Sequence, residues 1–220
     1  MRIAGLGFAS VLMWLSAAGI ARAGFVFEFG QAGSSPVSDF VITAVGDTVD
    51  VQVYLREFGS PGDILATELL FSSAVALTFD GTIAKVQDEL LDITPAPDFD
   101  VINFVSASTN EAALDVAAFL NPLVPPDPDN RILLGTFRFT GVSVGTTAIR
   151  VSDLTPGLDE TNTGDFTPLD DLIGDGWGAI AVQGGVVPEP TSLTLWGSLA
   201  VCGLVALWRR GRRRKDAVTG

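Results

Sequence analysis

The chain has 220 residues, including one cysteine and no histidine. Catalysis by a Ser-His-Asp or Cys-His arrangement is therefore excluded, together with the histidine-based zinc and copper sites. Between Gly24 and Pro190 there are 25 acidic and five basic side chains, a formal net charge of −20, which argues against binding to nucleic-acid phosphates.

The N-terminal residues 1–23 are typical of a secretory signal peptide. A basic residue, Arg2, precedes an apolar stretch from Ile3 to Ile20, and Ala21 and Ala23 then form an A-x-A cleavage site. An uncleaved membrane anchor is the alternative, since the apolar stretch is long. We expect cleavage after Ala23, because small residues crowd the end of that stretch.

Residues 24–186 predict one all-β domain, long enough to bury its own core. Apolar and polar residues alternate from Thr48 to Leu55, which directs Val49, Val51, Val53 and Leu55 toward the core. Two further strands are expected over residues 65–71 and 75–79.

The middle of the domain has weaker patterns. Apolar residues recur at roughly helical spacing over residues 83–93, which predicts a short helix at the edge of a sheet. Residues 112–120 are compatible with either a strand or a helix, because they are rich in alanine. The proline-rich residues 122–130 predict a loop.

The clearest pattern is a strand over residues 132–140, a glycine-bounded connection and a second strand over residues 146–151. A last strand is expected over residues 177–182. Many short strands separated by Gly, Pro and Asp turns indicate a β-sandwich of the jelly-roll type.

This arrangement resembles the cohesin-like domain, a nine-stranded jelly-roll sandwich related to some carbohydrate-binding modules. The matching segments are GDTVDVQVYL at 46–55, LGTFRF at 134–139 and GTTAIRV at 145–151, with the acidic segment after it. The resemblance spans about residues 40–182. It implies a docking module, since cohesins bind dockerins through one sheet face, but no residue pattern here identifies that surface.

Two groups of oxygen-bearing side chains are candidate calcium ligands, because hard cations take several oxygen ligands from irregular loops. Neither group has the EF-hand spacing, so solvated turn residues are the alternative. The first group is Asp127, Asp129 and Asn130, and the second is Asp165, Asp170, Asp171 and Asp175. No other cofactor is expected.

Paired carboxylates, Asp98 with Asp100 and Asp170 with Asp171, have the residue types of a glycosidase. Acidic pairs are expected by chance in so acidic a domain, so no catalytic residue is predicted and the protein is not expected to be an enzyme. Trp177 is a candidate for stacking on sugar rings, as is Tyr54. Their apolar neighbours instead favour core or half-buried positions.

The C-terminal segment contains three elements in order: Pro188, Glu189 and Pro190; an uncharged run over residues 191–208; and a basic cluster. As a helix, the run would span about 27 Å, enough for the hydrocarbon core of a bilayer. The positive-inside rule then keeps the basic cluster in the cytoplasm and the acidic domain outside. The cluster comprises Arg209, Arg210, Arg212, Arg213, Arg214 and Lys215.

Residues 187–215 resemble the PEP-CTERM sorting signal; a simple tail anchor is the alternative. The resemblance implies export, recognition by an exosortase (a membrane-embedded processing enzyme) and cleavage near the motif. The product would then reach the cell surface or an exopolysaccharide matrix. We therefore expect a non-enzymatic envelope or matrix protein that acts in adhesion, matrix organisation or protein docking. A carbohydrate-binding or calcium-dependent matrix module is the alternative.

Overall fold

The computed structural model describes residues 24–32, 36–59 and 63–184. The predicted signal peptide (residues 1–23) and sorting signal (residues 187–215) lie outside these ranges. Within them, no helix combines the length and apolar character needed to cross a bilayer.

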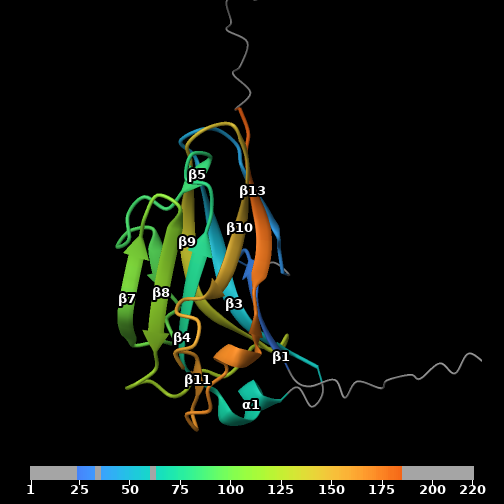
Figure 1. Cartoon of the computed structure of the whole chain (residues 1–220), viewed down its shortest axis with the longest axis vertical. Helices are drawn as coiled ribbons and strands as arrows, with labels where there is room; N and C mark the ends of the chain where they lie inside the picture. The colour runs from blue at the N-terminus through green and yellow to red at the C-terminus, as the bar shows by residue number, and fades with distance from the viewer. Residues whose placement is uncertain (1–23, 33–35, 60–62, 185–220) are drawn as a thin grey trace, which may run out of the picture.

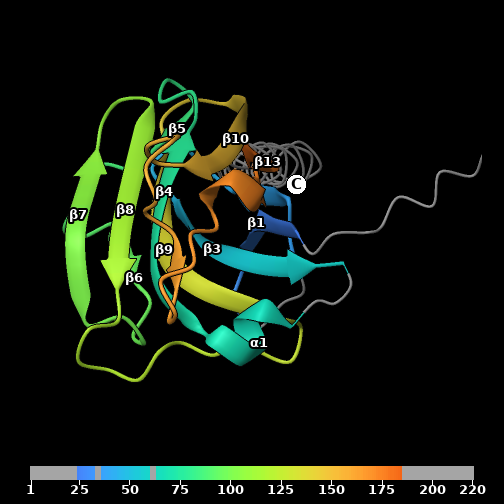
Figure 2. The same cartoon turned by 60° about the horizontal axis from the view of Figure 1, so that its bottom comes forward.

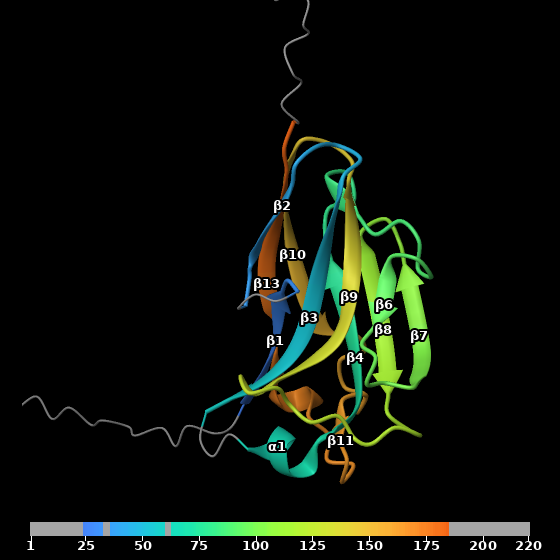
Figure 3. The same ribbon diagram turned by 180° about the vertical axis from the view of Figure 1, so that it is seen from behind.

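The domain is a sandwich of two β-sheets packed face to face (Figures 1 and 3). One sheet, here called sheet A, contains β1 (Gly24–Gly30), β3 (Thr48–Phe58), β5 (Ala84–Lys85), β6 (Ile93–Pro95), β9 (Arg131–Gly141) and β12 (Ile173–Gly174). Its strand order is β12-β1-β3-β9-β5, and β6 also pairs with β9.

The other sheet, sheet B, has a different set of strands. They are β2 (Asp39–Ile42), β4 (Leu70–Thr78), β7 (Val101–Ala107), β8 (Glu111–Ala117), β10 (Gly145–Asp153), β11 (Asn162–Thr163) and β13 (Gly176–Val182). The order is β2-β13-β10-β4-β8-β7, and β11 also pairs with β4. The described chain begins at the lower end of the sandwich with β1 and leaves at the upper end after β13 (Figure 1).

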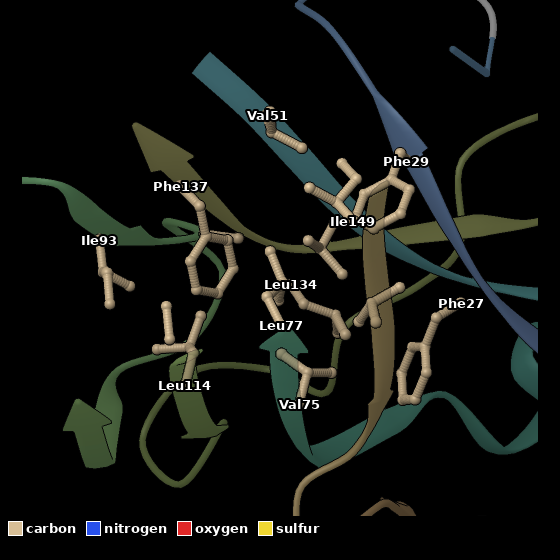
Figure 4. Packing of buried hydrophobic residues seen from close by; sticks show 14 of the residues in the cluster. Phe27, Phe29, Val51, Val75, Leu77, Ile93, Leu114, Leu134, Phe137 and Ile149 are labelled. Carbon is tan, nitrogen blue, oxygen red and sulfur yellow. The ribbon is translucent and has the colours of Figure 1, made fainter. Parts of the chain in front are cut away.

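Apolar side chains from both sheets fill the space between them (Figure 4). The predicted alternation in β3 is confirmed, because Val49, Val51, Val53 and Leu55 are all buried. The two strands predicted over residues 132–140 and 146–151 are also confirmed, although they belong to different sheets.

Leu114 of β8 reaches from sheet B to sheet A at a glycine. It is fully buried and lies beside Phe137 of β9 (Figure 4). In sheet A, opposite Leu114, the pairing register of β3 and β9 shifts between Val53 and Tyr54. A Cβ added to Gly135 at this shift would lie only 2.5 Å from the Leu114 Cδ2. The missing side chain of Gly135 therefore leaves the space that Leu114 occupies.

The strand predicted over residues 65–71 is wrong in its first half, where a short helix, α1 (Ile64–Glu68), precedes β4. The buried carboxylate of Glu57 accepts hydrogen bonds from the backbone N–H groups of Ile64 (3.0 Å) and Leu65 (2.9 Å). These N–H groups have no carbonyl partner within a helix, so a carboxylate from β3 satisfies them. Figure 2 shows α1 at the lower end of the sandwich.

The helix predicted over residues 83–93 is wrong. This segment forms β5, a turn and the start of β6. The carboxylate of Asp88 accepts hydrogen bonds from the N–H groups of Leu90 and Leu91, and that of Asp92 accepts from Gln87 and Asp88. Such local bonds compete with helical ones. The ambiguous residues 112–120 form most of β8 and the loop after it.

We predict that Leu114→Ala lowers the free energy of unfolding by about 2–5 kcal/mol, because it leaves a cavity between the sheets. Urea unfolding followed by circular dichroism measures the change. The control is Leu120→Ala in the loop after β8, where the side chain is 91% exposed and the expected change is below about 0.5 kcal/mol. Equal losses in the two variants would contradict the packing described for Leu114.

Candidate functional site

The outer face of sheet B, which points away from the core, carries an exposed tryptophan beside an arginine. Trp177 of β13 lies directly opposite Arg150 of β10 in the antiparallel register. The neighbours of Arg150 along β10, Ile149 and Val151, are buried in the core. Because side chains alternate between the faces of a strand, Arg150 must point outward.

The guanidinium of Arg150 is held by two contacts. Its Nε and Nη2 atoms donate hydrogen bonds to Asp175 Oδ2 at 2.9 and 2.6 Å. Its Cζ lies 5.3 Å from the centroid of the Trp177 ring, a cation–π distance. The ion pair and the ring contact together limit the conformations that the Arg150 side chain can adopt.

The structure overturns the sequence prediction for Trp177, whose side chain is 64% exposed. Ile180 and Val182 of the same strand are buried, so alternation directs position 177 to the outer face. Its two neighbours are glycines, and a Cβ on Gly176 would lie 2.2 Å from the Phe27 carbonyl oxygen. This alternation was a usable signal in the sequence. Tyr54 is half-buried, as expected, with Arg131 stacked 4.9 Å above its ring.

A hollow of about 470 Å³ lies beside Arg150 on this face. Ala76, Thr78 and Ser152 belong to its lining, and these short side chains leave room above the sheet. Five acidic residues also line it: Glu111, Asp153, Asp170, Asp171 and Asp175. The hollow therefore combines one fixed cation with several carboxylates.

Three carboxyl groups gather where the loop after β10 folds back over this end of sheet B. Burial is the largest cause that raises the pKa of Asp153 to about 6, and the negative charges of Asp170 and Glu160 contribute to the same shift. Burial also raises the pKa values of Glu160 and Asp170. Asp153 Oδ1 and Glu160 Oε2 are buried atoms without a hydrogen-bond partner. The ionised form of Asp153 is therefore unfavourable in the folded state.

The first predicted calcium group is occupied by an arginine. Arg131 is 8% exposed and donates to Asp127 Oδ2 (3.0 Å) and Asp129 Oδ2 (3.1 Å). Asp127 Oδ1 accepts the backbone N–H groups of Asp129 and Arg131. Asn130 completes this turn with a left-handed backbone (φ 62°).

The four residues of the second predicted calcium group do not lie together in the structure. Asp170, Asp171 and Asp175 line the hollow, whereas Asp165 is exposed on the loop after β11 and does not. Asp170 accepts the backbone N–H of Thr161, and Asp175 is paired with Arg150. Across the described parts of the chain, no three acidic side chains are arranged to hold a metal ion. Calcium binding thus gains no support and stays a prediction.

The paired carboxylates considered for glycoside hydrolysis have structural partners. Asp100 accepts backbone N–H groups from Phe119, Leu120 and Asn121, which fixes the loop after β8. Asp170 is bonded to Thr161 as described above, and Asp98 and Asp171 are exposed. The remaining predicted site residues lie outside the described ranges: Ala21, Ala23, Pro188, Glu189, Pro190 and the basic cluster.

No protein-family model matches the sequence, and no curated protein matches it. Among solved structures, a cohesin module from a family 33 glycoside hydrolase of Clostridium perfringens has a TM-score of 0.50 at 8% identity, covering 74% of this chain and 99% of that chain. A non-cellulosomal cohesin of Archaeoglobus fulgidus has a TM-score of 0.43 at 11% identity, covering 79% and 98%.

A type III cohesin module from a cell-surface anchoring scaffoldin of Ruminococcus flavefaciens has a TM-score of 0.45 at 10% identity, covering 82% of this chain and 97% of that chain. The similarity to the Clostridium perfringens module shows a cohesin-like β-sandwich, which is the part of the predicted fold class that the described residues bear on. At this identity it shows the fold alone.

We predict that stability falls as the pH rises through the interval from about 4 to about 6, since Asp153 holds its proton more tightly when folded. Below this pH interval the Asp153 carboxyl is protonated in both the folded and the unfolded state, so it does not lower the stability. Above the interval it is ionised in both states, and the full cost of burying its charge lowers the free energy of unfolding. Asp153→Asn should raise the free energy of unfolding at pH 7.5 by on the order of 1 kcal/mol, a value reduced for solvent screening.

Thermal unfolding at pH 4 and pH 7.5 tests this expectation. The gain from Asp153→Asn should be absent at pH 4. The control, Asp98→Asn, makes the same chemical change on an exposed loop and should alter the melting temperature little at either pH. A loss of stability in Asp153→Asn at pH 7.5 would contradict the proposed role of burial.

Proposed function

We propose that this chain is a non-catalytic module, exported to the cell envelope or extracellular matrix, that docks another protein through the outer face of sheet B. The observation that carries the proposal is the exposed Trp177 held against the Arg150–Asp175 ion pair. Tryptophan and arginine are the residues most enriched among those that dominate binding at protein interfaces.

The geometry of Arg150 favours binding to a partner. Its side chain is already restricted by Asp175 and Trp177, so little conformational entropy is lost when a partner contacts it. The adjacent hollow offers a concave surface lined by carboxylates. Such a surface is complementary to a protruding basic side chain of a partner protein.

A non-catalytic role is consistent with the chemistry of the site. The sequence has no histidine, and Asp100, Asp170 and Asp175 already accept hydrogen bonds from the chain itself.

Photo-crosslinking tests the docking face. With p-benzoylphenylalanine at Thr78, which pairs with Arg150 across β4 and β10, an envelope extract of the producing bacterium should give a discrete protein adduct. Arg150→Ala should reduce its yield at least about tenfold, as expected for an interface residue that contributes more than about 1.4 kcal/mol.

The matched control is Arg138→Ala on sheet A, which removes an exposed arginine from a comparable ion pair with Asp50. It should leave the adduct unchanged. The same adduct from a crosslinker at Thr48, on sheet A, would show that the captured protein does not dock on sheet B.

The export half of the proposal is supported by the order of elements in residues 187–215. We propose that the uncharged run over residues 191–208 holds the precursor in the bilayer while an exosortase cleaves near Pro188, Glu189 and Pro190. Proline disfavours helical backbone at its own position and at the residue before it, which would suit a segment that a membrane enzyme must cleave.

Mass spectrometry of the product from a host with an exosortase tests the export proposal. The mature protein should begin after Ala23 and lack the basic cluster at 209–215. The double variant Pro188→Ala, Pro190→Ala should accumulate with its tail intact, whereas Pro122→Ala in the domain should be processed normally. Recovery of full-length, unprocessed wild-type chain from the cytosol would refute export.

A further inference from the structure

Strand β7 forms one edge of sheet B and has only β8 as a neighbour in the described part of the chain. It is the outermost strand of the sandwich in Figures 1, 2 and 3. Its seven residues, VINFVSA, include no charged residue and no proline. The domain over residues 24–186 has a formal net charge of −19, and an uncharged edge strand stands out against it.

The other sheet edges are better protected. β2, at the opposite edge of sheet B, has four residues and begins with Asp39, and the edge strands β5, β6 and β12 have two or three residues each. Short strands, charges and prolines are the usual devices that prevent an edge from pairing with another chain. β7 has none of these three. A bulge between Ile102 and Phe104 interrupts only its first half.

The register with β8 identifies the backbone N–H and C=O groups of β7 that point away from β8. The N–H of Ser108 donates to the carbonyl of Glu111 (2.7 Å), so these residues form a hydrogen-bonded pair across the turn to β8. Hydrogen-bonded and non-hydrogen-bonded pairs alternate along an antiparallel ladder. Phe104 and Ser106 therefore direct their backbone groups to β8, and Val105 and Ala107 direct theirs outward.

The charges around β7 indicate which kind of strand would be attracted to this edge. Asp98 and Asp100 precede β7 on an exposed loop, Glu111 follows it, and Asp115 lies beside Phe104 on β8. A second copy of this chain would bring the same carboxylates to the edge and would be repelled. A strand with an apolar centre and basic ends is attracted instead.

We propose that β7 is a docking edge for an extended segment of a partner protein, which adds as a further strand of sheet B and carries lysine or arginine on both sides of an apolar centre. The strand gains affinity from backbone hydrogen bonds to Val105 and Ala107 and from contact with the exposed Phe104. The inference rests on the docking function proposed above but, apart from Glu111, uses different residues.

Fluorescence anisotropy of the full chain in nonionic detergent tests this proposal with the labelled nonapeptide KKVTVTVKK. Binding should be at least about tenfold tighter than that of EEVTVTVEE, and it should weaken when NaCl is raised from about 0.05 to about 0.5 M. Amide exchange over residues 101–107, followed by mass spectrometry, should slow when the basic peptide is bound.

Phe104→Lys should weaken peptide binding at least about tenfold, because it adds a like charge to the edge. The matched control is Val41→Lys on β2, since the two side chains are similarly exposed, 48% and 51%; it should leave binding unchanged. Ile102→Lys replaces Phe104→Lys if that variant does not fold. Arg150→Ala should also leave peptide binding unchanged, so failure of this proposal is distinguishable from failure of the docking face on sheet B.

Three results would overturn the proposal. The first is equal binding of the basic and acidic peptides. The second is a loss of binding in Val41→Lys equal to that in Phe104→Lys, which would place the peptide elsewhere. The third is a dimer, detected by light scattering, that strengthens with salt and is lost in Phe104→Lys, because a second copy would then be the occupant of this edge.

Discussion

Burial of apolar side chains between the two sheets is the interaction on which the rest of this structure depends. The single cysteine, Cys202, lies outside the described residues, so no disulfide can reinforce the domain and packing must supply its stability. Packing also determines the surface. Once Ile149 and Val151 are buried, the alternation of a strand places Arg150 on the outer face.

The acidity of the domain is the second constraint. Four of the five basic side chains between Gly24 and Pro190 form ion pairs: Arg56 with Glu28, Arg131 with Asp127 and Asp129, Arg138 with Asp50, and Arg150 with Asp175. In the described ranges, most of the 24 acidic residues form no ion pair. Both proposed docking surfaces therefore favour basic groups on a partner. Burial near other carboxylates also raises the pKa values of Asp153, Glu160 and Asp170.

Local patterns predicted the strands well where alternation was strict, as in β3 and β9. They failed where a side chain competes for backbone hydrogen bonds. Asp88 and Asp92 turn the expected helix over residues 83–93 into a turn between two short strands, and Glu57 stabilises a helix where a strand was expected. Glu57 belongs to β3 and Leu65 to α1, so the periodicity of a single strand or helix cannot relate the two residues.

The sequence by itself determined the all-β class, the absence of histidine chemistry, the acidic surface and the core-facing side chains of regular strands. These properties depend on composition and on a period of two residues. Only the tertiary structure decided that Arg150 meets Asp175 and Trp177, that Asp153 gathers with Asp170, and that β7 lies at an edge. Each depends on which distant segments pair, and pairing is decided by the packing of the whole sandwich.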